Sequence, residues 1–193
     1  MQNLLQQFLS AFEFLNPEEI ELIVQESDVR IFPKGSRLIS EGEVAKNCYF
    51  ILKGCVREYV LKEGEDRTTN IFLEQDSVTA FGSQQSGKPF SRNWECLEDC
   101  ILTVGTEQLE KEMCQKIPRL ADFILQEVEN QNGRIQDQLA HFIISNPEER
   151  YAQLLAHRPE IFQRVPQHQI ASYIGIKPES LSRLKSRLQK KGV

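Results

Sequence analysis

Between Asp28 and Thr106 the chain is a succession of short β-rich runs, and this pattern limits the fold more than any other feature. The runs are VRIF, RLIS, YFILKG, VREYVL, TTNIFL and CILTVG. They are separated by Gly, Asp, Lys and Glu residues, which favour turns. Six such runs at close spacing indicate a compact antiparallel sandwich or barrel. We therefore predict an antiparallel, jelly-roll-like β-barrel in the N-terminal part of the chain.

Helical patterns lie on both sides of this β-rich region. Residues from Leu4 to Ser27 have helical periodicity. Within them, Asn16 followed by Pro17 predicts an N-cap and the start of a second short helix. After the β-rich region, helical periodicity returns from Glu107 to Ser145. A β-barrel flanked by helices places the chain in the α+β class.

The long helix predicted between Glu107 and Ser145 carries an apolar stripe. One heptad row contains Ile117, Ile124, Gln131 and Gln138, and its neighbour contains Ala121, Val128, Ile135 and Phe142. A helix of about 28 residues is longer than a small barrel needs for its own core, and glutamine in the seam resembles a register-setting position. We interpret it as a dimerisation helix; the alternative is that the stripe packs on the barrel. Asn146-Pro147 ends this helix and opens the next one.

The stretch from Val165 to Leu184 has the organisation of a helix-turn-helix. Gly175 supplies a left-handed stop after the first helix, and Pro178 pre-sets the start of the second. The side chains expected to be buried are Ile170, Ala171, Ile174, Ile176, Leu181, Leu184 and Leu188. The alternative is an ordinary two-helix hairpin within a larger bundle.

The outer face of the second helix carries side chains that can read base edges or hold phosphates. Arg183 is suited to a guanine, and Glu179 to the amino group of a cytosine. Phosphate contacts are expected from Lys185, Arg187, Lys190 and Lys191. The predicted DNA-binding residues are Lys177, Glu179, Ser180, Ser182, Arg183, Lys185, Ser186 and Arg187.

Charge is distributed unevenly along the chain. The formal net charge is -5, which if evenly spread would argue against a nucleic-acid partner. Residues 146–193, however, hold nine basic side chains against four acidic ones, a local net charge of +5. A basic end on an acidic remainder is typical of a protein whose C-terminal part meets phosphate. A solvated basic helix is the alternative.

These patterns divide the chain into three parts. Residues 1–115 are predicted to form the sensor barrel, residues 116–145 the dimerisation helix, and residues 146–193 the DNA-binding domain. The N-terminal sequence MQNLLQQFLSAFEFLN has no positively charged leader and only short apolar runs. It indicates neither a signal peptide nor a membrane span, and we expect a cytoplasmic protein with no membrane partner.

A set of residues in the barrel is similar to the opening of a cyclic-nucleotide-binding domain. They are Phe32, Lys34-Gly35, Leu38, Glu41-Gly42-Glu43, Tyr49-Phe50-Ile51-Leu52-Lys53-Gly54 and Val56. Together with the helix-turn-helix, they make the chain resemble the Crp/Fnr family of transcription regulators over nearly its whole length. In that family, base-reading Glu and Arg residues stand where Glu179 and Arg183 stand here. The resemblance implies a homodimer, a pseudo-palindromic double-stranded DNA operator, and RNA polymerase as a further partner.

The resemblance is weaker among the residues that would identify the bound ligand. Members that bind cyclic nucleotides carry a Gly-Glu pair for the ribose and an Arg-Ser pair for the cyclic phosphate. In the equivalent stretch, Thr79–Trp94, Ala80 or Phe81 replaces the glutamate, and the arginine is displaced to Arg92. This phosphate-binding cassette is therefore degenerate, and a cyclic nucleotide would lose its bidentate partners. We expect cyclic AMP and cyclic GMP not to be the effector.

Two alternatives stay open for the effector pocket. It holds another, unidentified small molecule, in which case the lining residues are Phe81, Gly82, Ser83, Ser91 and Arg92. Otherwise it is filled by side chains such as Phe90 and Trp94. An effector would act by shifting the long helix and the hinge near Asn146.

The residues give little support for a metal centre or a catalytic site. The five cysteines are an odd number at irregular spacings, which favours reduced thiols. No cysteine precedes Cys48, so an N-terminal iron–sulfur sensor like that of some family members is not expected. Cys96 and Cys100, placed on one face of a strand, form either a redox pair or buried structural thiols. The barrel has no histidine, and no nucleophile–base pair is visible, so we expect neither a metal nor an enzyme.

The function that these features favour is sequence-specific DNA binding by an effector-modulated transcription regulator. The rival interpretation is a ligand-binding module whose C-terminal helices bind protein. Affinity that falls with rising salt would separate the two, because phosphate contacts release counterions.

Overall fold

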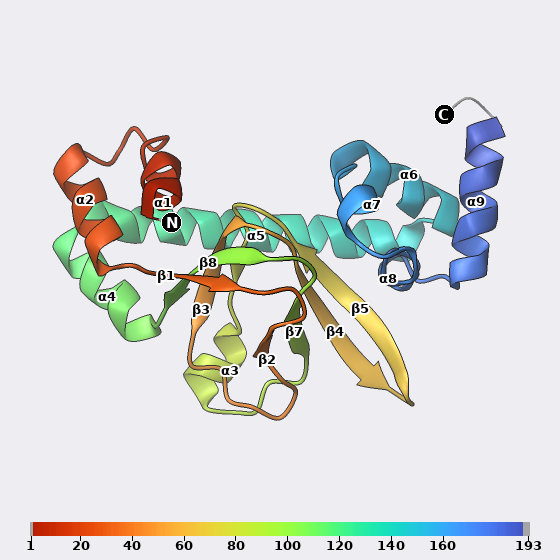
Figure 1. Cartoon of the computed structure of the whole chain (residues 1–193), viewed down its shortest axis with the longest axis horizontal. Helices are drawn as coiled ribbons and strands as arrows, with labels where there is room; N and C mark the ends of the chain where they lie inside the picture. The colour runs from red at the N-terminus through yellow and green to blue at the C-terminus, as the bar shows by residue number, and fades with distance from the viewer. Residues whose placement is uncertain (1, 191–193) are drawn as a thin grey trace. The chain divides into compact units, whose positions relative to one another are not determined.

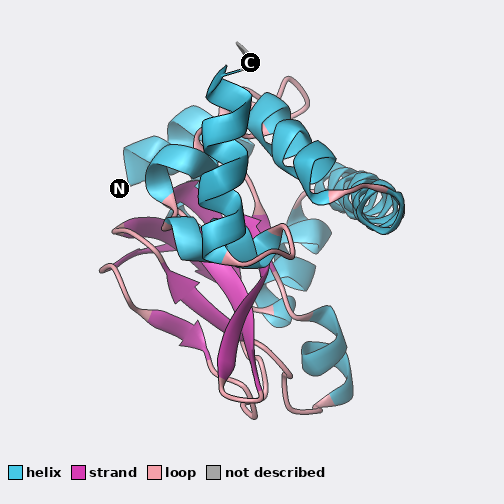
Figure 2. Cartoon of the chain, turned by 90° about the vertical axis from the view of Figure 1, so that its right-hand side faces the viewer, coloured by secondary structure: helices cyan, strands magenta, loops and turns pink. Residues whose placement is uncertain are grey.

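A computed structural model describes residues 2–190, apart from the side chains of residues 81, 82, 85 and 188–190. Within this range the chain forms two four-stranded β-sheets and nine helices (Figure 1). The α+β class predicted from the sequence is confirmed. Figure 2 distinguishes the sheets from the helices by colour.

All six predicted β-rich runs are strands. One sheet has the strand order β1-β8-β3-β6 and the other has the order β2-β7-β4-β5. The strands are β1 (Asp28–Phe32), β2 (Arg37–Ile39), β3 (Cys48–Lys53), β4 (Val56–Lys62), β5 (Glu65–Phe72), β6 (Ser77–Val78), β7 (Asn93–Cys96) and β8 (Cys100–Gly105). The pairing of β8 with β1 and β3 is antiparallel, with Phe32 opposite Cys100 and Tyr49 opposite Val104. The two strands not predicted, β6 and β7, are short.

The helices follow the predicted order, with one break. They are α1 (Gln2–Leu9), α2 (Pro17–Glu26), α3 (Phe81–Ser86), α4 (Glu107–Lys116), α5 (Pro118–Ile144), α6 (Pro147–His157), α7 (Ile161–Arg164), α8 (Gln167–Tyr173) and α9 (Pro178–Lys190). The periodic stretch from Glu107 to Ser145 is thus two helices. Ile117 leaves the helical conformation because it precedes a proline, with φ of -130° and ψ of 83°. Its side chain is buried rather than in the seam of the long helix.

Two asparagines start helices as the sequence predicts. Asn16 caps α2, and Asn146 caps α6. In each case the carboxylate of a glutamate at the third helical position accepts a hydrogen bond from the backbone amide of the cap residue, which completes a capping box. These local signals fix the point at which each helix begins.

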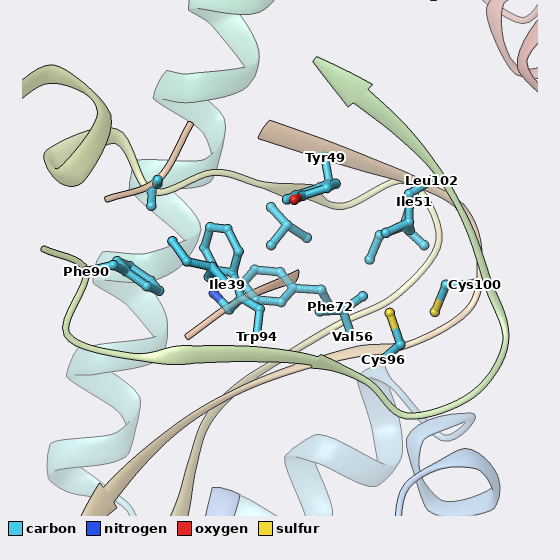
Figure 3. Packing of buried hydrophobic residues seen from close by; sticks show 13 residues of the cluster. Ile39, Tyr49, Ile51, Val56, Phe72, Phe90, Trp94, Cys96, Cys100 and Leu102 are labelled. Atoms are coloured by element: carbon cyan, nitrogen blue, oxygen red, sulfur yellow. The ribbon is translucent and has the colours of Figure 1, made fainter. Parts of the chain in front are cut away.

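The interior of the β-roll is a single apolar cluster that contains Tyr49, Ile51, Phe90, Trp94 and Leu102 (Figure 3). Trp94 is only 1% exposed. Its ring lies 4.9 Å from that of Phe90 and 6.5 Å from that of Tyr49, measured between centroids. Aromatic side chains therefore fill the space between the sheets.

The chain divides into two compact units. The first contains Met1–Glu58 and Ile71–Glu129, and the second contains Tyr59–Asn70 and Asn130–Val193. The outer part of the β4–β5 hairpin thus groups with the C-terminal helices. Among the described residues, no helix combines the length and apolar character needed to span a bilayer.

Candidate nucleic-acid interface and sensor pocket

Helices α8 and α9 form the helix-turn-helix predicted from the sequence. Gly175 lies between them with φ of +76°, in the left-handed region that favours glycine. The amide of Ile176 donates to the carbonyl of Ala171 at 2.9 Å and closes the turn. Ala171 and Leu181 are buried, so the two helices pack through their inner faces. Leu188, also expected on the inner face, has a side chain outside the described part of the structure.

The predicted DNA-binding residues lie in the turn before α9 and along this helix. The exposed ones are Lys177, Glu179, Ser180, Ser182, Arg183, Ser186 and Arg187, and Lys185 is half-buried. Within the described residues, the side chains of Glu179 and Arg183 make no hydrogen bond or ion pair. Their functional groups are therefore free to meet an external partner. The side chain of Lys190 and the whole of Lys191 lie outside the described residues.

Two of the predicted phosphate-contacting residues also hold α9 in place. The Lys185 ammonium donates to Oε1 of Gln167 on α8 at 3.0 Å. The Arg187 guanidinium pairs with Glu148 on α6 at 2.5 Å. These contacts join residues 18 and 39 positions apart, so no local sequence pattern indicated them. The candidate base-reading residues are thus unengaged, whereas the basic residues further along have internal partners.

Three of the predicted effector residues, Ser83, Ser91 and Arg92, have side chains that the structure describes, and they differ in their surroundings. Ser83 on α3 is buried, donates to the carbonyl of Lys88 at 2.6 Å and accepts from the amide of Ala45 at 3.0 Å. Ser91 and Arg92 are exposed. The side chain of Phe81 and the surroundings of Gly82 lie outside the described part of the structure. Ser83 therefore ties the cassette to the loop before β3.

The displaced arginine of the cassette has a partner inside the protein. Nε of Arg92 lies 3.3 Å from Oε2 of Glu58 on β4, and the guanidinium lies 5.1 Å from the centre of the Phe90 ring. The same carboxylate oxygen accepts a hydrogen bond from the indole Nε1 of Trp94 at 3.0 Å. We call Glu58, Phe90, Arg92 and Trp94 the cassette network. It surrounds a buried carboxylate with donors that a bound anion would otherwise use.

Glu58 was missed by the sequence reasoning. The run VREYVL is typical of a strand, but two ionisable residues stand where a buried strand would carry apolar ones. Arg57 and Glu58 are in fact 3% and 7% exposed. Adjacent charges in a strand between buried neighbours were the available signal, because buried charges need partners.

A cavity of about 410 Å³ opens on the loop before β3. Its lining residues are Leu38, Ile39, Glu43, Val44, Ala45, Lys46, Asn47, Tyr49 and Trp94. Ser83, Ser91 and Arg92, the predicted effector residues whose side chains the structure describes, are not among them. The Tyr49 hydroxyl donates to the carbonyl of Leu38, and the Glu43 carboxylate accepts from the amide of Ser40. The volume suits a small molecule, although part of the polar lining is already hydrogen-bonded within the protein.

Cys96 and Cys100 lie on two different strands, whereas the sequence reasoning placed them on one. Cys96 ends β7, and Cys100 begins β8 after a tight turn. Both side chains are fully buried, and both lie at one end of the apolar cluster (Figure 3). The hydrogen bond with Cys100, together with burial, raises the pKa of Cys96, so this thiol stays protonated at neutral pH. The inaccessibility of both thiols favours a structural role.

In the part of the chain that the structure describes, no group of His, Cys, Asp and Glu side chains is arranged to hold a metal ion. Burial, followed by the charge of Glu110, raises the pKa of both Cys48 and Cys114. Neither thiol is thereby activated as a nucleophile.

Comparison with known proteins finds a matching domain family, similar regulatory proteins and a similar solved structure. Residues 29–116 match the cyclic nucleotide-binding domain. The fumarate and nitrate reduction regulatory protein of Yersinia pestis is 27% identical over 173 residues, which cover 83% of this chain and 68% of that protein. Electron transport regulator A of Shewanella oneidensis is 24% identical over the same shares. The structure of FixK2 from Bradyrhizobium japonicum, 19% identical, covers 86% of each chain with a TM-score of 0.69 and shares the fold. Over most of its length this chain is thus similar to transcription regulators of the Crp/Fnr type, and its residues 29–116 match the cyclic nucleotide-binding domain.

Proposed function

We propose that this chain binds double-stranded DNA sequence-specifically through α9. The observation that carries the proposal is the contrast between the two faces of this helix. Leu181 and Leu184 are buried against the rest of the module, while Glu179 and Arg183 are exposed and unengaged. Arginine pairs with the O6 and N7 atoms of guanine, and glutamate accepts from the amino group of cytosine. The first turns of α9 would then enter the major groove.

The DNA-binding form is proposed to be a homodimer paired through α5. None of the described residues of α5 is buried within the chain. Its exposed large apolar residues are Leu125, Ile135, Leu139, Phe142, Ile143 and Ile144. An apolar stripe of this length needs a partner, and a second α5 supplies one by two-fold symmetry. Two copies of α9 would then face a pseudo-palindromic operator, with the chain divided functionally into residues 1–115, 116–145 and 146–193.

Cyclic AMP and cyclic GMP are proposed not to be effectors. The guanidinium of Arg92, the nearest candidate for a phosphate, faces the Glu58 carboxylate. Phe90 and Trp94 fill the interior behind it. An effector of another kind, if one acts, would be a small molecule able to enter the cavity beside Tyr49. RNA polymerase stays a proposed further partner on the strength of the family alone.

The proposal is tested by selection of the purified chain on a random-sequence duplex pool at moderate salt. Enrichment of an inverted repeat with half-sites about one helical turn apart is the expected result. A retained pool without any shared sequence, bound with an affinity that does not change with salt, would overturn the proposal in favour of a protein-binding module.

A further inference from the structure

The turn of the helix-turn-helix sits on the last turns of α5, within the second unit. A Cβ atom added to Gly175 would lie 3.3 Å from Cζ of Phe142 and 3.8 Å from Nη2 of Arg150. Glycine is therefore required here for close approach as well as for its positive φ. The sequence pattern predicts that Phe142 lies in the seam of the dimerisation helix, and the structure places its ring edge beside this turn as well.

Arg150 holds the same junction from α6. Its Nη1 atom donates to the carbonyls of Phe142 at 3.2 Å and Ser145 at 3.0 Å. These carbonyls belong to the end of α5, where helical partners run out. The guanidinium carbon lies 4.4 Å from the centre of the Phe142 ring, which adds a cation–π contact. One arginine thus caps α5, covers Phe142 and contacts the space beside Gly175.

A separate contact holds the C-terminal end of α8. The amide of Thr68 on β5 donates to the Ser172 hydroxyl at 2.9 Å. β5 is the edge strand of its sheet, so an outward amide there needs a partner from outside the sheet. Because Ser172 and Gly175 lie three residues apart, both contacts act on the same end of α8.

We infer that Phe142 and Arg150 are positioning residues that set the distance between the two DNA half-sites. This inference rests on the proposed function. If α5 pairs with its counterpart, any rotation of the helix-turn-helix on α5 changes the separation and angle of the two α9 helices. The close approach of Gly175 to Phe142, together with the contacts of Arg150, fixes the orientation of the helix-turn-helix on α5. Neither Phe142 nor Arg150 needs to touch DNA for this effect.

The test uses the full chain and operators in which the central spacer is lengthened or shortened by one and two base pairs. One base pair turns a half-site by about 35° and moves it about 3.4 Å. The wild-type chain is expected to bind its best spacing about tenfold more tightly than the neighbouring ones. Phe142→Ala and Arg150→Ala are expected to reduce this preference to about threefold or less. Base preferences within each half-site should stay unchanged.

Conservative variants separate positioning from folding. Arg150→Lys keeps the charge but cannot bridge both carbonyls and cover the ring, so it should also flatten the spacing preference. Phe142→Leu keeps an apolar contact and should retain most of it. Arg67→Ala is the matched control, because Arg67 in the same unit is exposed and pairs only with Glu65 among the described residues; it should behave as wild type. Thermal unfolding of every variant establishes that the chain is folded.

The possible results distinguish failure of this inference from failure of the proposed DNA-binding function. A wild-type chain that enriches no inverted repeat removes the proposed function and the inference with it. A wild-type chain with a sharp spacing preference that Phe142→Ala and Arg150→Ala both retain leaves the function intact and overturns the inference.

Discussion

The polar side chains of the cassette network are bonded within the chain, whereas those of Glu179 and Arg183 on the outer face of α9 are exposed. In the network, the carboxylate of Glu58 accepts a hydrogen bond from the Trp94 indole and pairs with Arg92. The carboxylate therefore has its partners inside the chain. On α9, by contrast, the carboxylate of Glu179 is exposed together with the guanidinium of Arg183. Polar groups that are satisfied internally stabilise a fold, whereas exposed ones on a rigid helix are available to a partner. The difference supports the proposal that α9, rather than the cassette, recognises an external partner.

The largest effect is expected from a substitution in the cassette network. Trp94→Ala removes a buried ring and the indole donor to Glu58. It should lower the free energy of unfolding by about 3–5 kcal/mol, as measured by urea denaturation. Ser91→Ala, at an exposed position, should change it by less than about 0.5 kcal/mol. A loss below about 1 kcal/mol for Trp94→Ala would show that the ring is not what fills the barrel.

The outer face of α9 is tested by Arg183→Ala. Removing the guanidinium should weaken binding to the selected operator by about 1–3 kcal/mol and relax the preference at one base position of each half-site. Fluorescence anisotropy with operators substituted at single positions measures both effects. Arg30→Ala on β1, where Arg30 pairs with Asp28, is the matched arginine control. Equal losses for the two variants would contradict a base-reading role for Arg183.

A smaller effect distinguishes phosphate contacts from base contacts on the same face. Lys177 is exposed in the turn before α9. Lys177→Ala should weaken binding to all duplexes about equally, and should reduce the slope of log affinity against log salt by about 1. Lys34→Ala, at an exposed lysine before β2, should leave the slope unchanged. A Lys177→Ala variant with altered base preference would move Lys177 into the base-reading set.

The smallest effect is expected from adding cyclic AMP. A ligand present at a hundredfold excess over its dissociation constant stabilises its receptor by about 2.7 kcal/mol. Because Arg92 faces Glu58 and aromatic rings fill the interior, we expect no change in Tm at millimolar cyclic AMP. Thermal unfolding measured over a range of concentrations checks this. A dose-dependent rise would show that the cassette network opens for a cyclic nucleotide.

Much of the fold follows from short-range signals in the sequence. Asn16 and Asn146 mark helix starts because each cap and its glutamate lie three residues apart. Gly175 marks the turn because few other residues adopt its positive φ. Similarly, the β-rich runs are strands because their composition suits a pleated surface. Each of these features is decided within a few residues of itself.

The features that the sequence did not predict depend on distant partners. Trp94 and Glu58 are 36 residues apart, and Arg187 and Glu148 are 39 apart. No local pattern shows which polar side chain will be buried opposite another. The cavity beside Tyr49 likewise arises from the packing of a loop against β7 rather than from a motif. The position of Phe142 under the turn was hidden because its heptad position equally suits a dimer seam.

DNA reading by the exposed Glu179 and Arg183 side chains of α9 is the proposal on which the other expectations depend. The most direct test is the affinity of the purified chain for the selected operator and for a scrambled duplex, measured by fluorescence anisotropy from low to moderate salt. We expect log affinity to fall linearly with log salt for both duplexes, and the operator to be bound at least about a thousandfold more tightly than the scrambled duplex. Equal affinity for both duplexes, or an affinity insensitive to salt, would contradict it.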